Sequence, residues 1–179
     1  MSDVLAACER ARAASHALSI ATKAEKDRAL AAIADAIEAH GESLIAANAK
    51  DVAAAVAAGT DASIIDRLTL DAPRLQTIAA AVRDVIAIAD PVGERIREYT
   101  LPNGLHIEQI RVPMGVVAMI YEARPNVTVD AASLCLKSGN VALLRGSASA
   151  VHSNTAIADI MRDAVRATGL PSDIIQLVP

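Results

Sequence analysis

The chain has 179 residues and a formal charge of −4, with 53% hydrophobic and 21% charged residues, so it is long and apolar enough to fold around a sizeable core. No basic tract stands out, and the only aromatic residues are Tyr99 and Tyr121, so we expect no nucleic-acid partner. There is no apolar run of about 18 residues, no apolar signal-peptide core and no cysteine pattern typical of a disulfide framework, so we expect a cytoplasmic protein without a membrane span.

The region 1–90 is predicted to be mainly helical, because apolar residues recur at intervals of three and four. Thr22 and Glu25 have the spacing of a capping box, in which each side chain accepts a hydrogen bond from the backbone of the other residue. The helix that follows is expected to end at Gly41, which can take the left-handed conformation. Asp71 predicts the start of a further helix, since aspartate is a favoured N-cap residue.

The apolar period changes to two residues in the segment 95–111. Two short alternating runs flank the sequence Leu-Pro-Asn-Gly, which is typical of a turn. The segment therefore predicts a β-hairpin, with Asn103 and Gly104 supplying two residues of positive φ.

The region 113–179 is predicted to be a βαβαβ unit. Apolar runs at 115–120 and 141–144 indicate buried strands, a helix should span about 152–168, and 174–178 indicates a last strand. The expected fold class is α/β, with amino-terminal helices, a hairpin and the first part of a Rossmann-like open parallel sheet. Because parallel sheets are normally covered on both faces and no helix follows the last strand, we expect an incomplete domain at the start of a larger fold.

A short loop of small residues, Arg145-Gly146-Ser147, follows the second of these strands and precedes a helix. Small residues let backbone N–H groups approach a phosphate, aided by the helix amino terminus, and the Arg145 guanidinium suits phosphate as well. No carboxylate lies in this loop to accept from a ribose hydroxyl, which favours NADP over NAD. The alternative interpretation is an ordinary βα turn with a surface arginine.

Arg124 and Asn126 are the candidate substrate or oxyanion residues. Pro125 disfavours the helical conformation at Arg124, so its side chain should be held on an extended segment, where it could clamp a carboxylate or an acyl phosphate. The Asn126 amide could donate to a developing oxyanion. The alternative is that Asn126 is the N-cap of a helix over 127–137.

We expect no catalytic nucleophile and no metal site in this sequence. Cys135 lies at helical spacing among apolar residues, which is typical of a buried, inert cysteine, and Cys8 lies on the first helix. The histidines lack a partner at metal-ligand spacing: His16, His40, His106 and His152.

The stretch Y-E-A-R-P-N-V-T-V-D-A-A-S-L-C-L-K-S-G-N at 121–140, with Arg-Gly-Ser at 145–147 and His-Ser-Asn at 152–154, resembles the γ-glutamyl phosphate reductase family of the aldehyde dehydrogenase superfamily. The resemblance extends over most of the chain and is strongest over 113–154. It implies an aldehyde dehydrogenase-like cofactor domain, with Arg145 near the adenosine ribose and an oxyanion-hole asparagine close to Arg124. It also implies that the nucleophilic cysteine belongs to a later, catalytic domain.

The function implied by the resemblance is the NADPH-dependent reduction of γ-glutamyl phosphate to glutamate semialdehyde, with release of phosphate, in proline biosynthesis. The implied mechanism is covalent: a thiolate displaces phosphate to form a thioester, which hydride then reduces. A homo-oligomer is expected for the full-length parent, and a fragment of this length is expected to be inactive alone. The alternatives are a non-catalytic nucleotide-binding or assembly module, and a related dehydrogenase that acts on another aldehyde or acyl phosphate.

Overall fold

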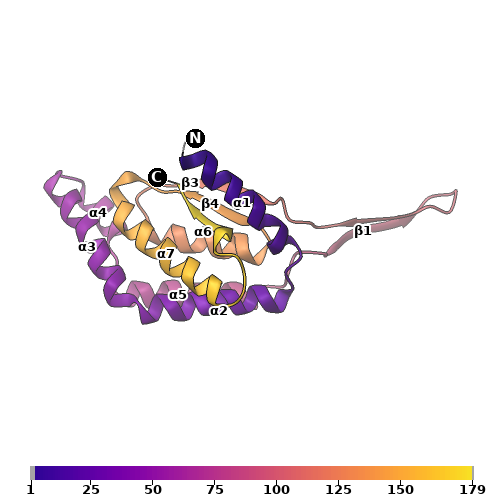
Figure 1. Cartoon of the computed structure of the whole chain (residues 1–179), viewed down its shortest axis with the longest axis horizontal. Helices are drawn as coiled ribbons and strands as arrows, with labels where there is room; N and C mark the ends of the chain where they lie inside the picture. Colours follow the sequence, from indigo (N-terminus) through magenta and orange to yellow (C-terminus); the bar gives the residue numbers. More distant parts are fainter. Residues whose placement is uncertain (1–2, 179) are drawn as a thin grey trace.

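The computed structural model describes residues 3–178, in which a small parallel sheet is covered by helices and a hairpin projects to one side (Figure 1). The α-helices are α1 (Asp3–Ser19), α2 (Lys23–Ala39), α3 (Gly41–Ala57), α4 (Ala62–Leu68), α5 (Ala72–Ala87), α6 (Pro125–Lys137) and α7 (Val151–Ala167). The strands are β1 (Arg95–Thr100), β2 (His106–Ile110), β3 (Val116–Ile120), β4 (Val141–Arg145) and β5 (Ile175–Leu177). Short 3₁₀ turns, η1 (Ala148–Ala150) and η2 (Ser172–Ile174), precede α7 and β5.

The parallel sheet has the order β3-β4-β5, which confirms the predicted βαβαβ arrangement. Val116 is paired with Val141 and Ile120 with Arg145, so β3 and β4 end at the same edge of the sheet. Helix α1 packs on one face, α6 and α7 pack on the other, and α2 and α5 form a further layer behind them (Figure 1). The carboxyl ends of the strands are therefore the edge at which the loops that follow β3 and β4 emerge.

The core is built from aliphatic side chains and alanine, as the composition requires. Leu30, Ile33, Leu144, Ile157 and Met161 are each at most 1% exposed. Alanine is common on the buried helix faces, including five core residues of α1 and α2, so helices approach one another and the sheet without large side chains between them. Within residues 3–178, no helix is both long enough and apolar enough to cross a lipid bilayer.

The predicted hairpin is confirmed, but its turn differs from the expected one. Strands β1 and β2 are antiparallel, with Thr100 opposite His106. Of the two turn residues expected to have a positive φ, only Gly104 has one, of 88°. The Gly104 N–H donates to the Leu101 carbonyl at 2.9 Å. Pro102 explains the difference, because its fixed φ suits the second position of a type I turn and leaves the left-handed conformation to the glycine that follows. Asn103 was therefore wrongly expected to take a positive φ.

The local signals in the helical region were partly correct. The capping box of Thr22 and Glu25 is present, and the Asp71 side chain accepts from Arg74 N at 2.8 Å. Gly41 does not end α2 in the left-handed conformation. It is the first residue of α3, so the two helices meet at His40 with no intervening loop. The short helix α4 was not predicted, although the Asp61 carboxylate caps it through Ser63 N at 2.8 Å.

A polar network fixes the root of the hairpin to the helical layer. Lys26, only 1% exposed, donates to Asp90 at 2.8 Å, and the same carboxylate accepts from Val92 N at 3.0 Å just before β1. On the other side of the hairpin, Asn140 Oδ1 accepts from Gly115 N at 2.9 Å. The chain segments that enter and leave the hairpin are therefore both held by partly buried hydrogen bonds.

Candidate functional site

A cavity of about 510 Å³ lies at the carboxyl ends of β4 and β5. It collects residues from four separate segments: the first helix, the loop after β4, one side of α7 and the chain end of β5. Its lining residues are Arg10, Arg145, Gly146, Ser147, Ala148, Val151, Asn154, Thr155, Ala158, Asp159, Arg162, Gln176, Leu177 and Val178. All three predicted cofactor residues, Arg145, Gly146 and Ser147, are among them, so the loop faces a cavity of the size of a small-ligand site.

Three arginines and one aspartate line this cavity, so its wall carries excess positive charge. Two of the arginines are already engaged: Arg162 Nη2 lies 3.0 Å from Asp173 Oδ1, and Arg10 Nη2 donates to Gln176 Oε1 at 3.3 Å. Arg145 donates only to the Gly146 carbonyl and forms no ion pair within residues 3–178. Its guanidinium is thus the cation of this wall that remains available to an anionic ligand.

Gly146 is required by the packing beneath the loop rather than by backbone strain. A Cβ atom at this position would lie 2.1 Å from Asn154 Nδ2 and 3.1 Å from Tyr121 Cε2. The hydroxyl of Ser147 accepts from Ser149 N at 3.3 Å, and so caps the η1 turn instead of standing free. The close packing of Gly146 against Asn154 and the hydrogen bond of Ser147 therefore hold the loop near the first turn of α7.

One expectation for this loop is wrong. The amino terminus of α7 was expected to aid the loop N–H groups in holding a phosphate, but the carboxylate of Asp51 in α3 already accepts from two N–H groups of its first turn. This carboxylate accepts from His152 N at 3.2 Å, from Ser153 N at 2.7 Å and from Ser153 Oγ at 2.6 Å. A buried carboxylate satisfies these donors and complements the helix dipole, so these amides are not available for an anionic ligand. No sequence signal linked residues so far apart.

Arg124 lies at the end of the loop after β3 and Asn126 lies in the first turn of α6, and their surroundings differ. Arg124 is extended, with φ −134° and ψ 93°, as Pro125 predicted, and its closest carboxylate oxygen, on Glu122, is 3.9 Å away. Asn126 donates to Asp130 Oδ2 at 3.1 Å and borders a separate cavity of about 300 Å³ near α5. Burial raises the pKa of Asp130, and the hydrogen bond from Asn126 offsets part of that effect.

The alternative that Asn126 caps α6 is wrong. Arg124 occupies the N-cap position, Pro125 is the first helical residue, and no side chain caps this helix. Proline suits this first position because its missing N–H would have had no partner within the helix.

The two cysteines differ in exposure, and Cys135 lacks the surroundings of a nucleophile. Cys135 is 7% exposed on α6, and burial raises the pKa of its thiol, so little thiolate forms near neutral pH. Cys8 is half-buried on α1.

One cluster of charged side chains was missed because its members meet across the hairpin. Ligand atoms of Glu98, His106 and Glu108 lie within 4.8 Å of one another on an exposed surface. Arg95 forms ion pairs with both carboxylates, with its Nε 3.4 Å from Glu108 Oε1. The cluster is therefore an ion-pair network among exposed side chains.

Comparison with known proteins shows the class of protein to which this chain belongs. The model of the aldehyde dehydrogenase family matches residues 1–179, so the chain belongs to the aldehyde dehydrogenase family. It is 54% identical to the gamma-glutamyl phosphate reductase of Kineococcus radiotolerans, over 96% of this chain and 40% of that protein. It is also 54% identical to the gamma-glutamyl phosphate reductase of Thermobifida fusca, over 99% of this chain and 42% of that protein.

A solved structure agrees with these relationships. The crystal structure of gamma-glutamyl phosphate reductase from Thermotoga maritima matches with a TM-score of 0.96 and 38% identity, over 99% of this chain and 43% of that one. The predicted fold class and the predicted family resemblance are both confirmed. The chain spans about 40% of the length of the curated relatives that it matches.

Proposed function

We propose that this chain forms the cofactor-binding part of an enzyme that reduces γ-glutamyl phosphate to glutamate semialdehyde and releases phosphate, in proline biosynthesis. The observation that carries the proposal is the cavity beside Arg145, at the sheet edge where ligands bind in open α/β folds. The curated relatives, at 54% identity, are gamma-glutamyl phosphate reductases. The residues of the cavity fit a nucleotide, because a free cation and a glycine lie side by side on its wall.

NADP is the proposed cofactor. The Arg145 guanidinium, which has no carboxylate partner within residues 3–178, would hold the 2′-phosphate, and Gly146 and Ser147 would let the loop backbone approach the ribose. The cofactor would supply the hydride that reduces the acyl group. Asp159, which also lines the cavity, is a carboxylate that could accept from a ribose hydroxyl, so the preference for NADP rests on Arg145.

Arg124 is the better candidate for the substrate anion. Its side chain is 46% exposed and only loosely engaged by Glu122, whereas the amide of Asn126 is already bonded to Asp130. A free guanidinium can bind a carboxylate or an acyl phosphate through two parallel hydrogen bonds.

Assembly and location belong to the same proposal. Apolar side chains on the hairpin are about half exposed, including Ile96, Leu105 and Ile110, which supports contact with another subunit and hence a homo-oligomer. A small phosphorylated substrate and a nucleotide cofactor are consistent with a cytoplasmic enzyme.

The test is nucleotide binding by the whole protein and its Arg145→Ala variant. A charged hydrogen bond is worth about 1.5–3 kcal/mol, so loss of Arg145 should weaken NADPH binding about 10- to 100-fold and NADH binding much less. The Kd values are measured by titration of nucleotide fluorescence. Equal Kd values for parent and variant would refute the cofactor site. Turnover of NADPH with γ-glutamyl phosphate, and with a second acyl phosphate as control, tests the substrate.

A further inference from the structure

A chain of buried hydrogen bonds runs beneath the cavity and joins the loop after β3 to the first turn of α7. The Tyr121 hydroxyl lies 2.7 Å from Thr128 Oγ1, and Thr128 Oγ1 donates to Asn154 Oδ1 at 3.0 Å. Thr128 is fully buried and Asn154 is 2% exposed. Buried polar groups of this kind hold one another in fixed orientations, because losing a partner without water to replace it is costly.

The donors and acceptors of this chain follow a single direction. A threonine hydroxyl has one hydrogen, which Thr128 donates to Asn154 Oδ1, so its oxygen accepts from the Tyr121 hydroxyl. The amide oxygen of Asn154 therefore points toward Thr128. The amide nitrogen must then point the other way, toward the loop of Gly146.

The nitrogen occupies the space where residue 146 would otherwise carry a side chain. Asn154 Nδ2 lies 2.1 Å from the position of a Cβ atom on Gly146, and both residues line the cavity beside Arg145. Within residues 3–178, Nδ2 donates to no protein acceptor, although Oδ1 of the same amide is bonded. A nearly buried amide with its donor free is suited to a ligand oxygen that would complete its hydrogen bonds.

We propose that Asn154 is a further binding residue of this site, whose Nδ2 donates to an acceptor oxygen of the nucleotide held beside Arg145. Tyr121 and Thr128 are positioning residues that keep the donor turned toward the cavity. This inference rests on the proposed cofactor site. It also explains why Gly146 is needed, since a side chain there would displace the Asn154 amide.

The experiment compares variants of the whole protein by direct titration with NADPH and, separately, NADH. Asn154→Asp keeps the shape and the acceptor for Thr128 but removes the donor, and Asn154→Ala removes the amide without adding charge. Both should raise the Kd roughly tenfold, with the KM for NADPH rising while kcat changes by less than about twofold. A loss on NADPH alone places the acceptor on the 2′-phosphate, and a loss on both nucleotides places it on a part that the two nucleotides share. Either result supports the inference.

The positioning role has its own test. Thr128→Val keeps the packing volume but removes the hydroxyl, and should weaken nucleotide binding, whereas Thr128→Ser should restore it. A purely structural role would lower the melting temperature in Thr128→Val and Asn154→Asp while leaving the Kd within about twofold of the parent value, and would overturn the inference. Arg145→Ala distinguishes a failure of this inference from a failure of the proposed cofactor site. If it weakens binding and the Asn154 variants do not, only this inference fails, whereas if none of them changes the Kd, the cofactor site itself fails.

Discussion

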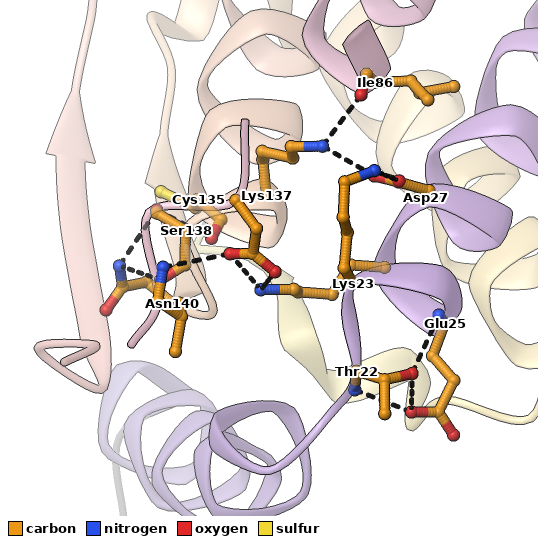
Figure 2. Close-up of polar contacts among 12 residues, drawn as sticks. Thr22, Lys23, Glu25, Asp27, Ile86, Cys135, Lys137, Ser138 and Asn140 are labelled. Carbon is orange, nitrogen blue, oxygen red and sulfur yellow. Dashed lines mark hydrogen bonds and ion pairs between the residues drawn. The ribbon is translucent and has the colours of Figure 1, made fainter. Parts of the chain in front are cut away.

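Lys137 Nζ lies 2.7 Å from Asp27 Oδ1, which joins the last turn of α6 to the amino-terminal half of α2 through an ion pair (Figure 2). The Lys137 side chain is 4% exposed and also donates to the Ile86 carbonyl at 2.9 Å, near the end of α5. One ammonium group therefore holds three helices together, and α6 carries on its other end the loop of Arg124. The geometry of the candidate site thus depends on charges buried behind the sheet.

Asp27→Asn should be strongly destabilising. It removes the negative charge opposite Lys137 and leaves a buried ammonium with neutral acceptors only, a change that costs about 3–5 kcal/mol in buried pairs. Asp35→Asn is the matched control, because Asp35 pairs with Arg83 on the surface and is 74% exposed, so its loss should cost about 0–1 kcal/mol. The free energies of unfolding are measured by urea denaturation. Equal losses in the two variants would contradict the role of the buried pair.

The carboxylates of Asp27 and Asp90 should set the pH below which the folded state loses stability. Burial by itself would raise the pKa of Asp27, but hydrogen bonds from Lys137 and Lys23 outweigh it and hold the pKa below its ordinary value. The pKa of Asp90 is lowered in the same way, with Lys26 opposing the effect of burial. Groups with a lower pKa in the folded state add stability above their unfolded pKa, about 4, and this stability is lost as the pH falls through the folded pKa.

We therefore expect the contribution of Asp27 and Asp90 to be constant from about pH 7 to pH 5 and to decline below about pH 4. Thermal unfolding followed by circular dichroism over this range measures the decline. In Asp27→Asn the acid limb should be shallower than in the parent, since one of the two titrating groups is missing. An acid limb of unchanged slope would show that other carboxylates set the limit.

The elements of this fold that could be predicted from sequence are those with local signals. The capping box at Thr22 and the aspartate cap at Asp71 each involve residues a few positions apart, and both are present. The predictions were wrong where a neighbouring residue or helix changed the local backbone conformation. Pro102 shifted the turn type at the hairpin, and a second helix followed Gly41 directly, so that glycine had no loop to enter.

Of the candidate cofactor site, only the loop after β4 could be predicted from the sequence. The βαβ pattern places Arg145 and its loop at the carboxyl edge of the sheet, and the cavity is there. Its other walls come from Arg10 on α1 and Gln176 on β5, whose approach depends on the packing of the whole chain. The carboxylate that fills the α7 amino terminus comes from Asp51, about a hundred residues away. No spacing rule connects residues that only tertiary contacts bring together.

Gly146→Ala should disturb the site through lack of space. The added Cβ would lie 2.1 Å from Asn154 Nδ2, so the amide must move and its bond to Thr128 must weaken, at a cost of about 1–3 kcal/mol. Gly41→Ala is the control: its added Cβ would meet Leu75 at 3.6 Å, and alanine in a helix should be neutral or stabilising by up to about 1 kcal/mol. Differential scanning calorimetry gives both values.

A double variant sharpens that prediction. Because Asn154→Ala removes the atoms that the new methyl group would strike, Gly146→Ala should cost much less in its presence than alone. Additive losses in the double variant would show that the two residues do not compete for the same space.

Cys135→Ala should leave turnover by the whole protein intact. Burial both raises the pKa of this thiol and blocks access to it, so it cannot serve as the attacking thiolate. We expect kcat to stay within about twofold of the parent value and stability to fall by about 1 kcal/mol, the typical effect of a core substitution. In the native protein, a thiol reagent should modify the half-buried Cys8 faster than Cys135. Loss of turnover with an unchanged melting temperature would instead identify Cys135 as the nucleophile, and the covalent step would then belong to α6.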